Sequence, residues 1–133
     1  MISNVCSFLL GGLFYILLEM AWRGRSHVSM FITGGFCCMV LAALFLRQEM
    51  SWPLRFIVSG LVISSAEFLT GVLVNIRLKK QVWDYRLLPC NLYGQVCLSC
   101  SLLWCCMALP IYLLGLYIQT LMNHLSYLCI NLL

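Results

Sequence analysis

Four long apolar stretches divide the chain and restrict what it can fold into. They cover residues about 4–21, 28–46, 54–76 and 92–118, and each is close to the roughly 20 residues that cross the hydrocarbon layer as an α-helix. None of them shows the alternation of polar and apolar residues that is typical of a membrane-barrel strand. We therefore expect an all-α integral membrane bundle of four transmembrane helices, formed by residues 1–133 as a single domain.

The overall composition excludes a water-soluble domain. Hydrophobic residues make up 63% of the chain and charged residues only 9%, whereas a soluble domain carries roughly 25% charged residues. A soluble core of this size could not bury so much apolar surface. The lipid bilayer is therefore the expected surrounding of the chain.

The end of the chain allows two interpretations. Pro110 falls inside the fourth apolar stretch and should kink or interrupt a helix there. Beyond Ile118, polar residues are mixed with leucines that share one helical face. We expect a short C-terminal amphipathic helix over residues 119–133, lying at the membrane surface. A longer, broken fourth helix is the alternative.

The loops predict an orientation. Residues 22–27 and 77–91 lie on the same side of a four-span protein and hold six of the eight Lys and Arg residues. The positive-inside rule then places both loops in the cytoplasm and both termini outside, in the inner membrane of a bacterium. Since the basic residues are split between short membrane loops, they do not indicate nucleic-acid binding.

The third stretch contains the sharpest candidate for a functional site. Gly60, Ser64, Glu67, Gly71 and Asn75 follow one another at steps of four, three, four and four residues, so they form one polar stripe on an apolar helix. A carboxylate at this depth is rare and commonly functional. Glu67 could handle a substrate or a proton. Alternatively, the stripe serves packing alone, because Gly60, Ser64 and Gly71 suit close helix contacts.

A second polar group is expected near the two basic loops. Glu19 can pair with Arg23 one helical turn later, either as an ion pair at a helix end or, with Arg25 and His27, as the charged mouth of a cavity. An acidic residue between two aromatics at residues 83–85 suggests a folded interfacial turn. Because the topology brings these segments to one side, we expect several polar side chains to converge there: Glu19, Arg23, Asn75, Asp84, Asn91 and Gln95.

The sequence predicts no metal site, no cofactor and no catalytic motif of its own. Cys97 and Cys100 form a C-x-x-C pair, but the two histidines, His27 and His124, are predicted on opposite sides of the membrane. Buried apolar cysteines are the better interpretation of the nine cysteines. The chain lacks a phosphate-binding loop and hydrolase motifs. We therefore expect that it is not an enzyme, and that a separate ATPase supplies any ATP-driven step.

Several segments together carry a resemblance to a known family. They are residues 22–30 (WRGRSHVSM), 67–71 (EFLTG) with Asn75, 83–85 (WDY), Pro89, Asn91 and 94–98 (GQVCL). In this order and spacing they resemble the CmpB-like, ABC-transporter type IV family of bacterial membrane proteins, over about Gly11 to Trp104. Cys90, Ser99 and Cys100 depart from the pattern of that family. The resemblance implies a transport permease.

Two classes of function follow from these observations. The first is a small permease component with Glu19, Glu67 and Asn75 on its polar face, working as a homo-oligomer, with a partner membrane subunit or with an ATPase. In such an oligomer, Gly60, Ser64 and Gly71 are a candidate contact face. The second class is a non-transporting regulatory or assembly subunit, or an intramembrane enzyme with Glu67 as general acid or base.

Overall fold

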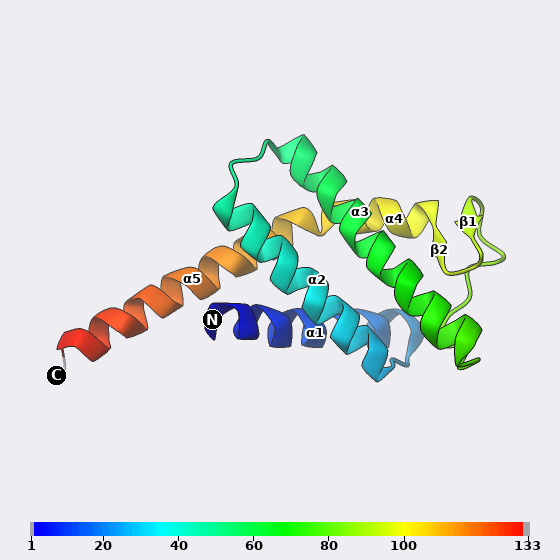
Figure 1. Ribbon diagram of the computed structural model, residues 1–133, viewed down its shortest axis with the longest axis horizontal. Helices are drawn as coiled ribbons and strands as arrows, with labels where there is room; N and C mark the ends of the chain where they lie inside the picture. Colours follow the sequence, from blue (N-terminus) through cyan, green and yellow to red (C-terminus); the bar gives the residue numbers. More distant parts are fainter. Residues whose placement is uncertain (1, 132–133) are drawn as a thin grey trace.

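The computed structural model describes residues 2–131, which are largely helical, with short loops at residues 24–27 and 48–51 and a longer loop region that contains a small hairpin (Figure 1). The elements are α1 (Ile2–Arg23), α2 (Val28–Arg47), α3 (Trp52–Gly71), the π-helical segment η1 (Val72–Arg77), β1 (Asn91–Leu92), β2 (Val96–Cys97), α4 (Leu98–Cys106) and α5 (Ala108–Asn131). Within the described residues, four stretches are long and apolar enough to cross a membrane, namely Ile2–Arg23, Val28–Arg47, Trp52–Arg77 and Leu98–Asn131. The prediction of an all-α fold with four such helices is confirmed.

The fourth stretch differs most from the prediction. Its helix begins at Leu98 rather than near residue 92, because residues 91–97 form an antiparallel hairpin. The helix is then interrupted at Met107, three residues before Pro110. Proline has no N–H to donate to the carbonyl of Cys106, and its ring crowds that carbonyl. The regular helical pattern resumes when the N–H of Ile111 bonds to Met107 O at 3.1 Å.

The separate amphipathic tail helix is not confirmed. Residues 119–131 continue α5 without interruption, so the described part of the tail has the form of the longer, broken fourth helix, and residues 132–133 lie outside the described range. The two helices α4 and α5 cover 34 residues, about 50 Å at 1.5 Å per residue, which exceeds the roughly 30 Å hydrocarbon layer. The end of α5 accordingly extends beyond the other helices (Figure 1).

Two pairs of adjacent glycines let α1 and α2 approach closely. A Cβ on Gly12 of α1 would lie 2.6 Å from the Phe31 carbonyl oxygen, and one on Gly34 of α2 would lie 2.5 Å from Tyr15 Cβ. Real Cβ atoms do not come so near, so only glycine fits this crossing. The close approach places the Tyr15 side chain directly over α2.

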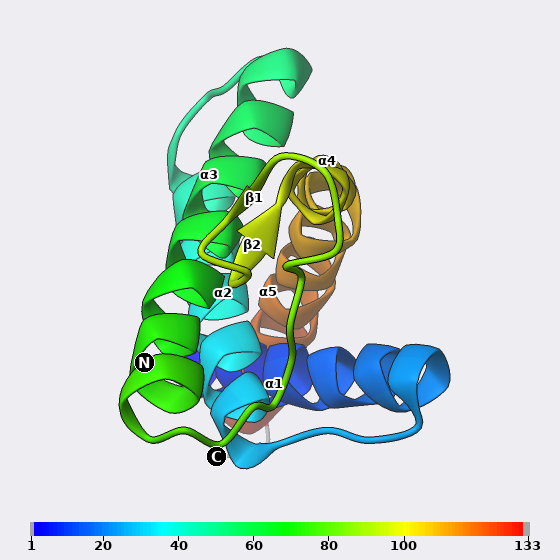
Figure 2. The same ribbon diagram turned by 90° about the vertical axis from the view of Figure 1, so that its right-hand side faces the viewer.

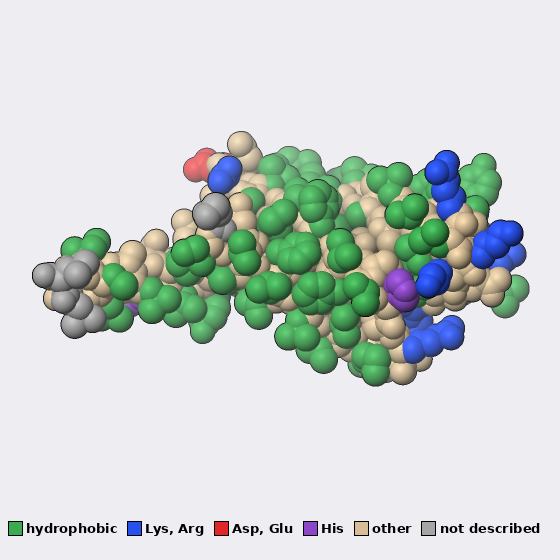
Figure 3. Space-filling view, turned by 60° about the horizontal axis from the view of Figure 1, so that its bottom comes forward, with side chains coloured by type: hydrophobic (Ala, Val, Ile, Leu, Met, Phe, Trp, Pro, Cys, Tyr) green, Lys and Arg blue, Asp and Glu red, His purple; other side chains and the backbone are tan. Residues whose placement is uncertain are grey.

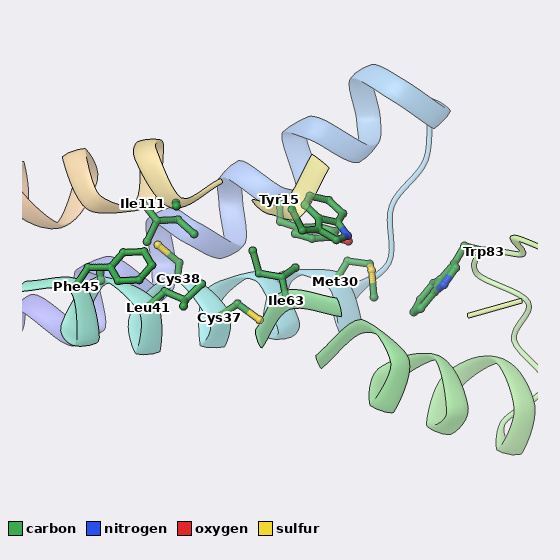
Figure 4. Close-up of a cluster of buried hydrophobic side chains, with 12 residues drawn as sticks. Tyr15, Met30, Cys37, Cys38, Leu41, Phe45, Ile63, Trp83 and Ile111 are labelled. Carbon is green, nitrogen blue, oxygen red and sulfur yellow. The ribbon is translucent and has the colours of Figure 1, made fainter. Parts of the chain in front are cut away.

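The buried core is centred on α2. Residues from its whole length are shielded, including Met30, Leu41 and Phe45, and α1, α3 and α5 pack around them (Figure 4). Ile63 of α3 joins the same cluster. α2 is thus the helix against which the others are positioned.

The loop of residues 78–97 folds across one end of the bundle (Figure 2). Trp83 is only 5% exposed, and its indole N–H donates to the Gln95 carbonyl at 2.8 Å. Lys and Arg side chains gather at this end of the molecule, beside the loop between α1 and α2 (Figure 3). The loop therefore has a fixed structure that closes the bundle at its basic end.

Candidate intramembrane carboxylate site

Glu67 lies deep in the bundle and far from both ends of its helix. It is 2% exposed, and it stands twelve residues after Arg55 and ten before Arg77. At about 1.5 Å per residue, these cations are roughly 15–18 Å away along the helix axis. For comparison, half of a hydrocarbon layer that is roughly 30 Å thick is about 15 Å.

Two aromatic residues from other helices bind the Glu67 carboxylate. The hydroxyl of Tyr15 on α1 donates to Oε1, and the indole N–H of Trp104 on α4 donates to Oε2 at 2.8 Å. The two rings also stack on each other, with centroids 5.5 Å apart and planes 26° from parallel. Each carboxylate oxygen therefore has its own donor, and three helices meet at this one side chain.

Glu67 differs from Glu19, the other buried acidic side chain, in having no ion-pair partner. Glu19 pairs with Arg23 and Asp84 pairs with Arg86, whereas Glu49 is exposed. In the part of the chain that the structure describes, no Lys, Arg or His makes an ion pair with Glu67. Its partners are neutral donors.

The stripe predicted on the third span faces α4 and the segment before it in the same chain. The hydroxyl of Ser64 donates to that of Ser101 at 2.8 Å, Gly60 lies against Cys105, and a Cβ on Gly71 would come within 2.5 Å of Gln95 Oε1. This face is therefore occupied within the monomer, and it is not the free contact face that we considered for an oligomer.

The predicted pair of Glu19 and Arg23 forms, and it connects α1 to the loops. The guanidinium of Arg23 donates to Glu19 Oε1 and, at 3.3 Å, to the Val82 carbonyl, while the Ser26 hydroxyl donates to Glu19 Oε2 at 2.6 Å. Both carboxylate oxygens are satisfied by groups of α1 and its following loop. The cluster thus joins the end of α1 to Val82 in the later loop, 59 residues after Arg23.

Asn75 organises the other half of this polar region. Its amide N–H groups donate to the Trp83 carbonyl at 3.0 Å and to Gln95 Oε1 at 2.8 Å, and its oxygen accepts from the Val82 N–H at 2.7 Å. Through residues 82–83, the structure brings Glu19, Arg23, Asn75 and Gln95 into one connected network.

The remaining predicted residues lie at the edge of this network. Asp84 accepts from the side chain and backbone N–H of Arg86, and Asn91 donates to the Arg86 and Leu88 carbonyls, so both stabilise the turn locally. Arg25 and His27 line a shallow depression of about 160 Å³ with Lys80. His27 also caps α2, because its Nδ1 accepts from the Ser29 N–H at 3.1 Å.

Two titratable groups of the loop have shifted pKa values. The hydrogen bonds and charge of Arg86 hold the pKa of Asp84 below its ordinary value. Burial raises the pKa of Tyr85 above its ordinary value, with a smaller contribution from the Glu67 charge. Near neutral pH, Asp84 is therefore ionised and Tyr85 is protonated.

The cysteines are more varied than the sequence suggested. Cys37, Cys38 and Cys97 are buried, but Cys90, Cys106 and Cys129 are exposed, so the expectation of generally buried thiols holds only in part. Among residues 2–131, no group of three or more His, Cys, Asp or Glu side chains is arranged to hold a metal ion.

Sequence reasoning missed both partners of Glu67. Tyr15 lies one turn before Glu19 on the polar face of the first span, and Trp104 follows Cys97 and Ser101 at steps of four and three residues. These spacings would have placed Tyr15 on the face of Glu19, and Trp104 on the face of α4 that meets the stripe. The adjacent glycines at 11–12 and 34–35 were a further unused signal for close packing.

Comparison with known proteins agrees with the architecture. The model of the family described as "Putative ABC-transporter type IV" matches residues 6–133, which extends the resemblance seen in residues 11–104 to nearly the whole chain. Searches of curated proteins and of solved structures gave no match. The four apolar helices and this match together identify a multi-pass membrane protein. The chain belongs to the CmpB-like, ABC-transporter type IV family.

Proposed function

We propose that this chain is a membrane-embedded transport component and that Glu67 is the group through which it handles a proton. The observation that carries the proposal is a fully buried carboxylate in a membrane-spanning stretch, bound by two neutral donors from two other helices. An ionisable group at such a depth is costly to maintain and is a functional candidate for that reason. Family membership supports the assignment to transport.

The two donors assign different roles to the two oxygens of Glu67. Trp104 can only donate a hydrogen bond, whereas the Tyr15 hydroxyl can donate or accept one. If Glu67 takes up a proton, the Oε1 atom that faces Tyr15 can carry it and donate back to the phenolic oxygen. The Trp104 bond to Oε2 is kept in both states. Proton uptake would thus reverse one bond between α1 and α3 and leave the Tyr15 hydroxyl hydrogen without the acceptor that it has now.

This reversal offers a route from protonation to helix movement. Tyr15 is packed over Gly34 of α2, where the backbones leave no spare room. A change in the Tyr15 bond therefore acts at a tightly packed crossing, and tightly packed crossings respond by discrete shifts. We infer that proton binding biases the packing of α1 against the other helices.

Infrared difference spectroscopy of isotope-labelled protein in lipid nanodiscs tests the site directly. Between about pH 4 and about pH 9, the range that buried glutamates cover, a protonated carboxyl band should change in the wild type and be lost in Glu67→Gln. The control is Glu49→Gln, the same change at an exposed glutamate. The amide introduced by Glu67→Gln can donate to Tyr15 and accept from Trp104, so this variant should fold. Identical spectra for wild type and Glu67→Gln would refute proton binding at Glu67.

The permease role requires a separate test, because this chain contains no ATPase motif. Mild-detergent purification followed by mass spectrometry should recover an ATPase or a partner membrane subunit. Transport by the reconstituted complex should then fall in Glu67→Gln and persist in Glu49→Gln. Unchanged transport in a folded Glu67→Gln variant would contradict the proposed role of Glu67.

A regulatory or assembly subunit is the second candidate, and the end of α5 favours it. This segment extends beyond the other helices, and it exposes Leu121, Leu125 and Leu128 (Figure 1). Exposed apolar residues on an isolated helix are a typical surface for a partner. Truncation after residue 119 should release the co-purifying subunit while α1–α4 stay folded if this second candidate is correct.

A further inference from the structure

An apolar groove lies next to the Glu67 site. It has a volume of about 370 Å³ and is lined by side chains from all four spanning stretches. Pockets of roughly 300–1,000 Å³ with mostly apolar walls are typical of small-molecule sites. Leu13, Phe14 and Leu17, which line the groove, are exposed on a spanning helix. A molecule dissolved in the lipid phase can therefore reach the groove from the side.

Tyr15 and Trp104 belong to both the groove and the carboxylate site. Both residues line the groove, and the polar end of each is bonded to Glu67. The carboxylate consequently lies behind an aromatic wall rather than in the open groove. Figure 4 shows Tyr15 in the same cluster as Ile63 and Cys37, which also line the groove.

The charges around the groove select for a cation. Aromatic faces attract cations through their quadrupole, with a strength that increases on desolvation. Behind these rings lies Glu67, the one buried acid among the described residues without an arginine partner. None of the described lining residues is basic. An apolar cation would meet apolar walls, two aromatic rings and a carboxylate that has no ion-pair partner, although the charge of Arg23 reaches it.

We propose, building on the proton-handling function above, that this groove binds a lipophilic organic cation, an amine or quaternary compound with an apolar body. The cation enters from the lipid and lies against Tyr15 and Trp104. When Glu67 carries a proton, binding releases that proton to water and leaves the carboxylate as the counter-ion. One positive charge leaves the site and one enters it, so the exchange is balanced in charge.

Tetraphenylphosphonium and tetraphenylborate make a matched pair of probes, since they have the same shape and opposite charge. Binding to the purified chain in nanodiscs can be measured by equilibrium dialysis, with empty nanodiscs subtracted. The wild type should bind the phosphonium, more weakly as the pH falls, and Glu67→Gln should lose at least about tenfold in affinity. Glu49→Gln should bind as the wild type does. Binding of the borate should not depend on Glu67.

A second pair of variants separates the groove from the carboxylate. Leu114→Trp fills the groove from α5 and should abolish phosphonium binding, whereas Leu61→Trp, at an exposed position outside the groove, should not.

Equal binding of both probes, or phosphonium binding that survives Glu67→Gln, would overturn the proposal and indicate an acyl-chain groove. If the infrared signal of Glu67 still titrates in that case, the proton-handling function stands without a cationic ligand. If that signal is also absent, both proposals fail.

Discussion

Trp104 Nε1 lies 2.8 Å from Glu67 Oε2, and this hydrogen bond joins α4 to α3 near the middle of the bundle. The same indole stacks on Tyr15, which binds the other carboxylate oxygen. A single aromatic side chain therefore positions both the acid and its second donor.

Removing only the indole donor should destabilise the bundle. In Trp104→Phe the stacking ring remains, but Glu67 Oε2 loses its bond in a buried site, which costs about 1–3 kcal/mol. The midpoint of unfolding in a detergent titration should fall accordingly. Trp52→Phe is the matched control, because Trp52 is exposed and its indole contacts other rings and the Arg55 guanidinium through its face and edge, contacts that a phenyl ring can keep. An equal loss of stability in both variants would show that the Trp104 hydrogen bond does not contribute to the stability of the bundle.

The extent to which the sequence predicts this site can be judged at Glu67. The residue and its stripe are evident from spacing, because period and polarity are local properties. Its partners are not, since Tyr15 is 52 residues away and Trp104 is 37 residues away. Which residues meet depends on how each helix is rotated about its axis, and packing of all four helices decides that.

The bounds of the predicted spans likewise include some that local sequence properties predict and one that they do not. Hydropathy placed the first three spanning stretches within two residues at each end, with η1 counted as part of the third, because their ends coincide with polar loops. It failed at residues 92–97, where the apolar run continues through a hairpin whose turn needs Tyr93 and Gly94 at positive φ. Apolar content alone does not distinguish a short buried strand from the start of a helix.

Adding one methyl group at the crossing of α1 and α2 should be destabilising. A Cβ on Gly34 would lie 2.5 Å from Tyr15 Cβ, and overpacking of this kind costs about 1–3 kcal/mol. The gain in helix propensity, about 0.5–1 kcal/mol, is too small to offset it. Gly115→Ala is the graded control, because its nearest neighbours would be 3.2 Å away and can adjust. Detergent unfolding should therefore show a loss for Gly34→Ala and little change for Gly115→Ala. The reverse order would contradict the described crossing.

Asn75→Ala should loosen the loop of residues 78–97. The amide makes three hydrogen bonds, to Val82, Trp83 and Gln95, and alanine makes none of them. Hydrogen exchange at the Val82 amide should become faster by at least about tenfold, which corresponds to a loss of about 1.4 kcal/mol. Asn123→Ala, the same change at an exposed position of α5, should leave this exchange unchanged. Protection of Val82 in the Asn75 variant would show that other contacts hold the loop.

The predicted orientation can be tested with two exposed thiols at opposite ends of the molecule. Cys90 lies in the basic loop, and Cys129 lies near the end of α5 (Figure 1). The positive-inside rule places Cys90 in the cytoplasm and Cys129 outside. A membrane-impermeant maleimide added to intact spheroplasts should therefore label Cys90→Ser, which keeps Cys129, and should not label Cys129→Ser. Permeabilisation should make Cys90 reactive in the second variant. Buried thiols such as Cys37 are shielded from the reagent and need no replacement, whereas Cys106, which is also exposed, and Cys6, which is half-buried near the N-terminus, are replaced by serine in both variants. The opposite labelling pattern would invert the orientation, and labelling of both variants in intact spheroplasts would place the two thiols on one side and contradict a single span between them.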